Sequence, residues 1–133
     1  MNVNRPDLLR AVLSAAAWLG VAAFAPTAGA HHSVAAFDRA NPTALSGTVK
    51  NFKYTNPHTW IYLMVPDGKG GESQWDLEGG TVNMAVSQGW TRNKVKPGMK
   101  VKLLIAPRKD GKEGGEWLRL LEIDGKPFEA SNK

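Results

Sequence analysis

Residues 59–65 read TWIYLMV, and this run decides the fold class. Its β-branched and aromatic residues favour a β-strand, in which successive side chains point to opposite faces. One face then collects aliphatic side chains suited to a core, namely Ile61, Leu63 and Val65. The other face collects amphipathic side chains, namely His58, Trp60, Tyr62 and Met64.

A second strand follows this run after a turn. Residues 66–71 read PDGKGG, and their proline and glycines break a strand and supply positions that accept a positive φ. Residues 72–78 (ESQWDLE) then alternate polar and apolar side chains. We therefore expect residues 59–65 and 72–78 to form a hairpin.

Further elements flank this hairpin. Three β-rich runs lie at residues 44–55 (ALSGTVKNFKYT), 99–106 (MKVKLLIA) and 116–123 (EWLRLLEI). Residues 81–88 (TVNMAVSQ) have apolar residues at helical spacing, and Gly89 can end that helix. This order predicts a mainly β domain, a small five-stranded OB-like barrel with one short helix between strands three and four. An open antiparallel sandwich is the alternative.

Residues 1–30 have the features of a signal peptide. Arg5 and Arg10 precede an apolar run at residues 11–25, and residues 26–30 end in Ala-Gly-Ala. The apolar run is shorter than the ~20 residues that span a bilayer, so we expect cleavage after Ala30 and no stable membrane span in the mature form. The prediction is a periplasmic or secreted protein with an N-terminal arm (31–43), a barrel domain (44–128) and a flexible tail (129–133).

The composition limits the chemistry. The chain has no cysteine, which excludes thiolate metal sites, disulfide exchange and a cysteine nucleophile. Its serines and glycines form neither a nucleophile elbow nor a phosphate-binding loop, so the sequence favours a binding protein over an enzyme. The leader carries two arginines and one aspartate, so its removal lowers the formal charge from +5 to +4. Scattered lysines and export argue against a nucleic-acid partner.

Cleavage after Ala30 would make His31 the first residue, which offers its α-amine and its imidazole to one metal ion. His32 follows it directly, and the turn Asn56-Pro57 presents His58, the third histidine, at the start of a strand. If the arm folds across the Trp60 face, all three histidines meet and predict a site for a divalent metal. The alternatives for His58 are a general base and a structural hydrogen bond to a loop carbonyl.

Nitrogen ligands without thiolate suit Cu(II), and divalent affinities peak at copper, although zinc accepts the same ligands. Binding needs a deprotonated α-amine and neutral imidazoles, whose reference pKa values are about 8 and about 6.5. The affinity is therefore expected to fall as the pH drops through these values. A carboxylate can orient a liganding imidazole, and three candidates are open: Asp38, Asp76 and Glu78.

A metal-free binding module is the alternative function. It would use an aromatic face on the two hairpin strands to hold an unidentified periplasmic partner or a small ligand, such as a sugar or a peptide. The residues of this face would be Trp60, Tyr62, Met64 and Trp75. Copper-dependent oxidation is a third possibility.

The motifs of the chain resemble those of a group of small exported bacterial proteins of unknown function. That group has a His-His-Ser start, a Ser/Thr-Gly-Thr-Val strand, an Asn-Pro-His-x-Trp turn, a Trp-x-x-Glu-Gly-Gly segment and a Gly-Trp-Thr-Arg segment. In this chain the motifs lie at residues 31–33, 46–49, 56–60, 75–80 and 89–92. The resemblance covers essentially all of the expected mature chain and implies membership without an activity.

Two further resemblances concern copper. The expected N-terminal His31, with His58 or His32 as second histidine, is similar to the histidine brace of exported copper carriers and oxidative polysaccharide enzymes. The His-x-Trp strand with Met64 is similar to small periplasmic barrels that hold Cu(I) with histidine, thioethers and an aromatic face. Each resemblance implies copper as the metal.

Overall fold

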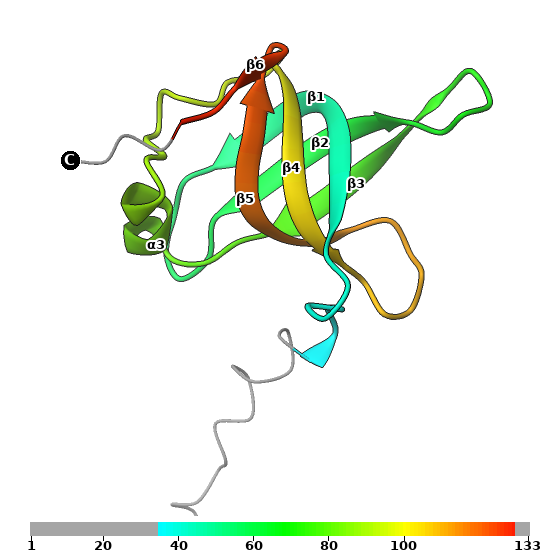
Figure 1. The fold of residues 1–133 in the computed structure, drawn as a ribbon, viewed down its shortest axis with the longest axis horizontal. Helices are drawn as coiled ribbons and strands as arrows, with labels where there is room; N and C mark the ends of the chain where they lie inside the picture. Colours follow the sequence, from blue (N-terminus) through cyan, green and yellow to red (C-terminus); the bar gives the residue numbers. More distant parts are fainter. Residues whose placement is uncertain (1–34, 130–133) are drawn as a thin grey trace, which may run out of the picture. The chain divides into compact units, whose positions relative to one another are not determined.

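The computed structural model describes residues 35–129. Within this range six strands form one sheet, and a short helix follows the third strand (Figure 1). The elements are β1 (Thr43–Lys53), β2 (Trp60–Pro66), β3 (Glu72–Glu78), α3 (Val82–Ser87), β4 (Lys100–Pro107), β5 (Gly115–Ile123) and β6 (Lys126–Pro127). The mainly β fold and the place of the helix are confirmed. The expected leader, its cleavage site, His31, His32 and residues 130–133 lie outside the described residues.

Strands β2 and β3 form the predicted antiparallel hairpin. Ile61 lies opposite Leu77, and Leu63 lies opposite Trp75. Ile61, Leu63 and Leu77 are fully buried, as the alternation of side chains predicts. In the turn, Asp67 Oδ1 accepts hydrogen bonds from backbone amides at residues 69 and 71. The hairpin tip lies at the end of the sheet opposite to α3 (Figure 1).

The remaining strand pairings bring distant segments together. The sheet order is β3-β2-β1-β4-β5-β6, and β5 also pairs with β3 in parallel. That parallel pairing joins Leu77 to Gly115 and Glu78 to Glu116. It therefore sets two glutamates, 38 positions apart in the sequence, next to each other at the end of β3.

The core lies between the strands and the segment that follows α3. It consists of aliphatic side chains from β1, β2, β3 and β4 and Leu120 of β5, together with Ala85, Val95 and two tryptophans, Trp90 and Trp117. The two indole rings stack with centroids 4.4 Å apart. Such pairs add about 0.5–1.5 kcal/mol to the stability that their burial provides.

Helix α3 begins and ends as its sequence predicts. The Thr81 side chain accepts a hydrogen bond from the Met84 amide at 3.3 Å, which caps the first turn. Ala85 is fully buried against the core, and Gly89, at φ 82°, follows the last turn. None of the helices in the described range 35–129 is both long enough and apolar enough to cross a membrane.

Strand β6 adds to the five strands that the sequence predicts. The turn Asp124-Gly125, with φ values of 48° and 77°, reverses the chain so that Ile123 pairs with Lys126. Aspartate followed by glycine is a common signal for such a two-residue hairpin turn. Phe128 then packs against the core. The expected count of five was wrong because the chain continues past the last predicted run, residues 116–123, into this short hairpin.

Candidate functional site

The Asn-Pro-His turn meets the Glu-Gly-Gly segment at the end of the β2–β3 hairpin. The Thr59 amide donates to Gly80 O at 2.9 Å, and the Gly79 amide donates to Thr59 O at 2.8 Å. Thr59 is fully buried, and its hydroxyl also donates to Gly80 O. Asn56 Oδ1 accepts from the Val82 amide at 2.9 Å, which ties the turn to the start of α3. His58 is therefore held between two well-anchored segments.

The His58 ring has one nitrogen engaged by its neighbours. Its Nδ1 lies 3.1 Å from Gly79 O and 3.1 Å from Glu78 Oε1. Both are acceptors, the first a backbone carbonyl and the second a carboxylate oxygen, so Nδ1 carries the hydrogen. In the neutral ring Nε2 then carries the lone pair. The side chain is 46% exposed, which leaves the ring accessible from solvent.

Gly79 holds the position of the carbonyl that His58 contacts. A Cβ atom at residue 79 would lie 2.1 Å from the Trp117 ring and 2.5 Å from Thr59 Oγ1. No side chain larger than hydrogen fits between these two buried groups. The first glycine of the Glu-Gly-Gly segment is thus required by close packing beside the histidine.

A small cavity of about 190 Å³ opens beside His58. It is lined by charged, aromatic and thioether side chains, among them Phe37, Arg39, His58, Glu78, Met84 and Glu116. Arg39 donates two hydrogen bonds to the Glu116 carboxylate, at 2.6 and 2.5 Å. These bonds raise the pKa of Arg39 above its ordinary value. The Arg39–Glu116 pair ties β5 to the segment that precedes β1.

The described part of the N-terminal arm runs beside this cavity. Phe37 is buried and bridges to Arg108, while the Asp38 amide donates to Pro107 O at 2.8 Å. Phe37 also lines a second cavity, of about 430 Å³, together with Trp60. The arm therefore comes next to the hairpin at Phe37, while the predicted meeting of His31 and His32 with His58 lies outside the described residues.

Of the three candidate carboxylates, Glu78 is the one that contacts His58. Asp76 is exposed and accepts a hydrogen bond from Gln74 Nε2 at 2.7 Å. Asp38 accepts from Asn41 Nδ2 at 3.0 Å, and this bond lowers the pKa of Asp38. The strand register explains why Glu78 is the carboxylate that contacts His58. Glu78 is the last residue of β3 and lies directly opposite Trp60, which follows His58 by two positions.

Within residues 35–129, no group of three or more histidine, aspartate or glutamate side chains is arranged to hold a metal ion. His58 is the single histidine of that range. A metal at His58 would therefore need ligands of another type, or ligands from the chain that precedes residue 35.

The aromatic face of β2 has a different composition from the one predicted. Trp60 and Tyr62 stack with ring centroids 6.4 Å apart and planes 17° apart, and Lys53 Nζ lies 5.4 Å from the Tyr62 centroid. Trp75 lies opposite Leu63 and packs against the core. Its assignment to the face of Trp60 and Tyr62 was wrong, since the residues directly opposite Trp60 and Tyr62 in β3 are Glu78 and Asp76.

Three residues that line the cavity beside His58 were not predicted from the sequence. Arg39 and Glu116 meet through long-range pairing, which the sequence gives no means to locate. Met84 was assigned only to a predicted helix, although its place three residues after the capping Thr81 puts it in the first turn beside the Glu-Gly-Gly segment. Met84 contacts that segment because the hydrogen bond from the Val82 amide to Asn56 Oδ1 anchors the start of α3. The sequence does not reveal this hydrogen bond.

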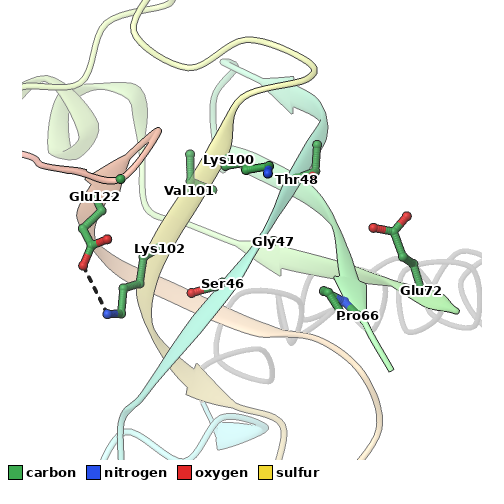
Figure 2. A pocket seen from close by; sticks show the side chains of 10 residues that line it. Ser46, Gly47, Thr48, Pro66, Glu72, Lys100, Val101, Lys102 and Glu122 are labelled. Atoms are coloured by element: carbon green, nitrogen blue, oxygen red, sulfur yellow. Dashed lines mark hydrogen bonds and ion pairs between the residues drawn. The ribbon is translucent and has the colours of Figure 1, made fainter. Parts of the chain in front are cut away.

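A larger cavity, of about 410 Å³, lies elsewhere on the sheet, where β1, β4 and β5 meet the hairpin ends (Figure 2). Lys102 Nζ and Glu122 Oε1 pair there at 3.1 Å. Its lining contains neither a histidine nor an aromatic side chain. This cavity offers an ion pair but no imidazole.

The sequence profile of a Family of unknown function (DUF6152) matches residues 17–117. The chain belongs to this family. No functionally curated protein matches the chain. Membership of the DUF6152 family agrees with the resemblance to an uncharacterised family, and the function has to be argued from the His58 site.

Proposed function

We propose that this protein binds a divalent metal ion, copper by preference and zinc as the alternative, at His58. The ligands are His58 Nε2 and the α-amine and imidazole of His31 at the mature N-terminus. His32 is a further candidate. The proposal includes export to the periplasm, cleavage after Ala30, and a closed OB-like barrel, for which the parallel β3–β5 pairing is the supporting feature.

The observation that carries the proposal is the geometry at His58 Nδ1. Histidine ligands of metals almost always donate their second ring N–H to a carboxylate or a backbone carbonyl, which fixes the tautomer and makes the ligand more basic. His58 Nδ1 lies 3.1 Å from one group of each kind. Nε2 is the nitrogen left for a metal.

The length of the arm supports His31 as the partner. Phe37 is six positions after His31, and an extended chain of six residue steps spans up to about 20 Å. Phe37 and His58 line the same cavity. The arm is thus long enough for the expected N-terminus to reach His58. A chelating amine and imidazole would supply the nitrogen ligands that residues 35–129 lack.

The test is calorimetric titration with Cu(II) and with Zn(II) of the protein as exported by an expressing bacterium. Its intact mass reports the cleavage site. Three variants accompany it: His58→Ala, His32→Ala, and a form that retains one additional residue before His31. His58→Asn is a further variant, which keeps a donor toward Gly79 but has no imidazole nitrogen.

We expect one-to-one binding that is weakened by the extra residue and by both changes at His58. Loss with His32→Ala as well would add that residue to the ligand set. Equal binding by the parent protein, His58→Ala and the extended form would overturn the proposal, and so would an absence of binding by the parent.

A second candidate function rests on the aromatic face. Trp60 and Tyr62 present a stacked pair with Lys53 on one side and Asp76 and Glu78 on the other, a combination that suits a polar ligand with a flat apolar face. Binding of such a ligand would be independent of His58 and would fail with Trp60→Ala. The metal proposal expects the reverse pattern.

A further inference from the structure

Strand β5 has one edge that its partner strands leave partly open. Its other edge pairs with β4 from the first residue of β5 to the last. The open edge pairs with β3 at residues 115–116 and with β6 at residues 122–123. Between these two pairings, residues 35–129 provide this edge with one further backbone hydrogen bond, from the Phe128 amide to Leu121 O at 2.8 Å. Residues 117–120 therefore form an open stretch of strand edge between β3 and β6.

A β-bulge lies in this open stretch. Trp117 pairs with Ile105 and Arg119 pairs with Leu104, so Leu118 is an extra residue opposite two consecutive residues of β4. Leu118 is half-buried, between the buried Trp117 and the exposed Arg119. A bulge leaves its extra residue outside the ladder and bends the strand, and bulges are common beside functional sites. The bulge thus separates Leu118 from the core side chains of β5.

Two cavities follow the open edge between β5 and the region of α3 (Figure 1). The first, of about 320 Å³, is lined by Met84, Gln88, Trp117 and Leu118, among others. The second, of about 440 Å³, is lined by Gln88, Leu118 and Phe128, among others. Because Gln88 and Leu118 line both, the two cavities adjoin, and together we call them the β5 groove.

One end of the β5 groove is cationic. Arg119 lines the second cavity, and Lys94 Nζ lies 5.7 Å from the ring centroid of Phe128, which lines it too. Both basic residues are exposed, and in the described part of the chain neither forms an ion pair. At the other end of the groove, Arg39 compensates the charge of Glu116. The groove therefore attracts negative charge at the end that Arg119 lines.

We propose that the β5 groove binds an extended acidic peptide segment of a partner protein, which adds a strand to the open edge of β5. A strand edge presents backbone N–H and C=O groups, and another extended backbone complements them. Leu118 and Met84 contact apolar side chains of the peptide. Arg119 and Lys94 bind its carboxylates. The proposal goes beyond the metal site and is independent of it, because His58 lines neither cavity of the groove.

The charge of the chain favours an acidic partner over a second copy as the occupant. The formal charge of the chain is +5, so a second copy would bring another basic protein to the cationic end of the groove. Like charges that meet at an interface disfavour association, whereas complementary charges favour it. An acidic segment satisfies both the strand edge and the unpaired cations.

The experiment measures the binding of a capped, fluorescently labelled peptide of alternating glutamate and valine to the exported protein. Fluorescence anisotropy gives the affinity. A second peptide has lysine in place of glutamate and tests the charge preference. A third peptide has the side chains of the first on a fully N-methylated backbone, which has no N–H donors and cannot form the strand pairing.

Four variants locate the binding site. Leu118→Trp fills the groove, and Val86→Trp is its matched control, because Val86 is exposed on α3 and lines neither cavity. Arg119→Glu reverses a charge of the groove, and Lys69→Glu makes the same reversal at an exposed position of the hairpin turn. Circular dichroism checks the fold of all four variants. If Leu118→Trp does not fold, the exposed position of Arg119 still decides the question.

We expect the glutamate peptide to bind, and the lysine and N-methylated peptides to bind at least about tenfold more weakly. Leu118→Trp and Arg119→Glu should each weaken binding of the glutamate peptide by about tenfold or more. Val86→Trp, Lys69→Glu and His58→Ala should match the parent protein. The amide NMR signals of Leu118 and Arg119 should shift when the peptide is added.

An absence of binding by the glutamate peptide would overturn the proposal, and so would equal binding by the N-methylated peptide. Equal affinity in the parent protein, Leu118→Trp and Arg119→Glu would also overturn it, because the peptide would then bind elsewhere. Sedimentation tests the second copy as the occupant. A dimer of the parent protein that Leu118→Trp dissociates would assign the groove to a second copy and would overturn the proposal as well.

Discussion

Two of the cavities beside the sheet, the one that contains the Lys102–Glu122 ion pair and the one beside His58, differ in both size and chemistry. The cavity lined by Lys102 and Glu122 measures about 410 Å³, whereas the cavity beside His58 measures about 190 Å³. The larger one carries an exposed ion pair. The smaller one carries an imidazole whose Nδ1 faces two acceptors, a thioether and two carboxylates. Side-chain chemistry, and not volume, identifies the candidate site.

The largest expected effect is on the free energy of unfolding, from a change in the packing around the smaller cavity. Gly79→Ala should destabilise the fold by about 3 kcal/mol, because its Cβ would lie 2.1 Å from the buried Trp117 ring. Gly71→Ala is the control, since its nearest contact, at 2.8 Å, is a carboxylate oxygen of the exposed Asp67 and not a buried ring, and it should cost less than about 1 kcal/mol. Denaturant unfolding measures both. Equal stabilities would mean that Gly79 does not fix the carbonyl beside His58.

Metal affinity should separate the cavities most clearly. His58→Ala should weaken Cu(II) binding about 100-fold, which corresponds to about 2.7 kcal/mol, because the proposed site would lose one of its nitrogen ligands. Lys102→Ala in the larger cavity should leave the affinity unchanged. Competition titration against a chelator of known affinity gives both values. If Lys102→Ala proved the more harmful change, the metal would belong to the larger cavity.

A smaller effect is expected at the carboxylate that contacts His58. Glu78→Gln keeps an acceptor toward Nδ1 but removes the charge, so Cu(II) affinity should drop about tenfold, or about 1.4 kcal/mol. The matched change Glu122→Gln in the larger cavity should leave the affinity unchanged. The same competition titration is used. Equal affinities for the two variants would reduce Glu78 to a structural partner of the ring.

The smallest effect concerns the ion pair of the larger cavity. The Lys102 and Glu122 side chains are 41% and 37% exposed, so their attraction is weakened by solvent. Glu122→Gln should therefore change the free energy of unfolding by less than about 1 kcal/mol. Thermal unfolding at low and at moderate salt measures this. A loss above 2 kcal/mol would show that the pair is structurally important.

Local patterns were sufficient to predict most of the fold. The alternation around Ile61 and Leu63 predicted the buried face of β2, and Thr81 and Gly89 marked the ends of α3 correctly. These features depend on residues close in the sequence, where propensity and turn chemistry act. The short strand β6 was missed although Asp124-Gly125 carried the signal for its turn.

Less of the site than of the fold could be predicted from the sequence, because the contacts of the site join strands that are distant in the chain. Glu78 could not be selected from three carboxylates until the register placed it beside Trp60 and His58. Trp75 was assigned to the wrong face because the relative register of two strands determines which residues share a face. Arg39 and Glu116 meet only through tertiary pairing.

The central claim is that His58 Nε2 binds the metal while Nδ1 keeps its hydrogen. Long-range ¹H–¹⁵N NMR of the imidazole rings, before and after one equivalent of Zn(II), tests it most directly. We expect His58 to be the Nδ1–H tautomer in the free protein, with a change at Nε2 when Zn(II) binds. A His58 spectrum that Zn(II) leaves unchanged, or coordination through Nδ1, would contradict the claim.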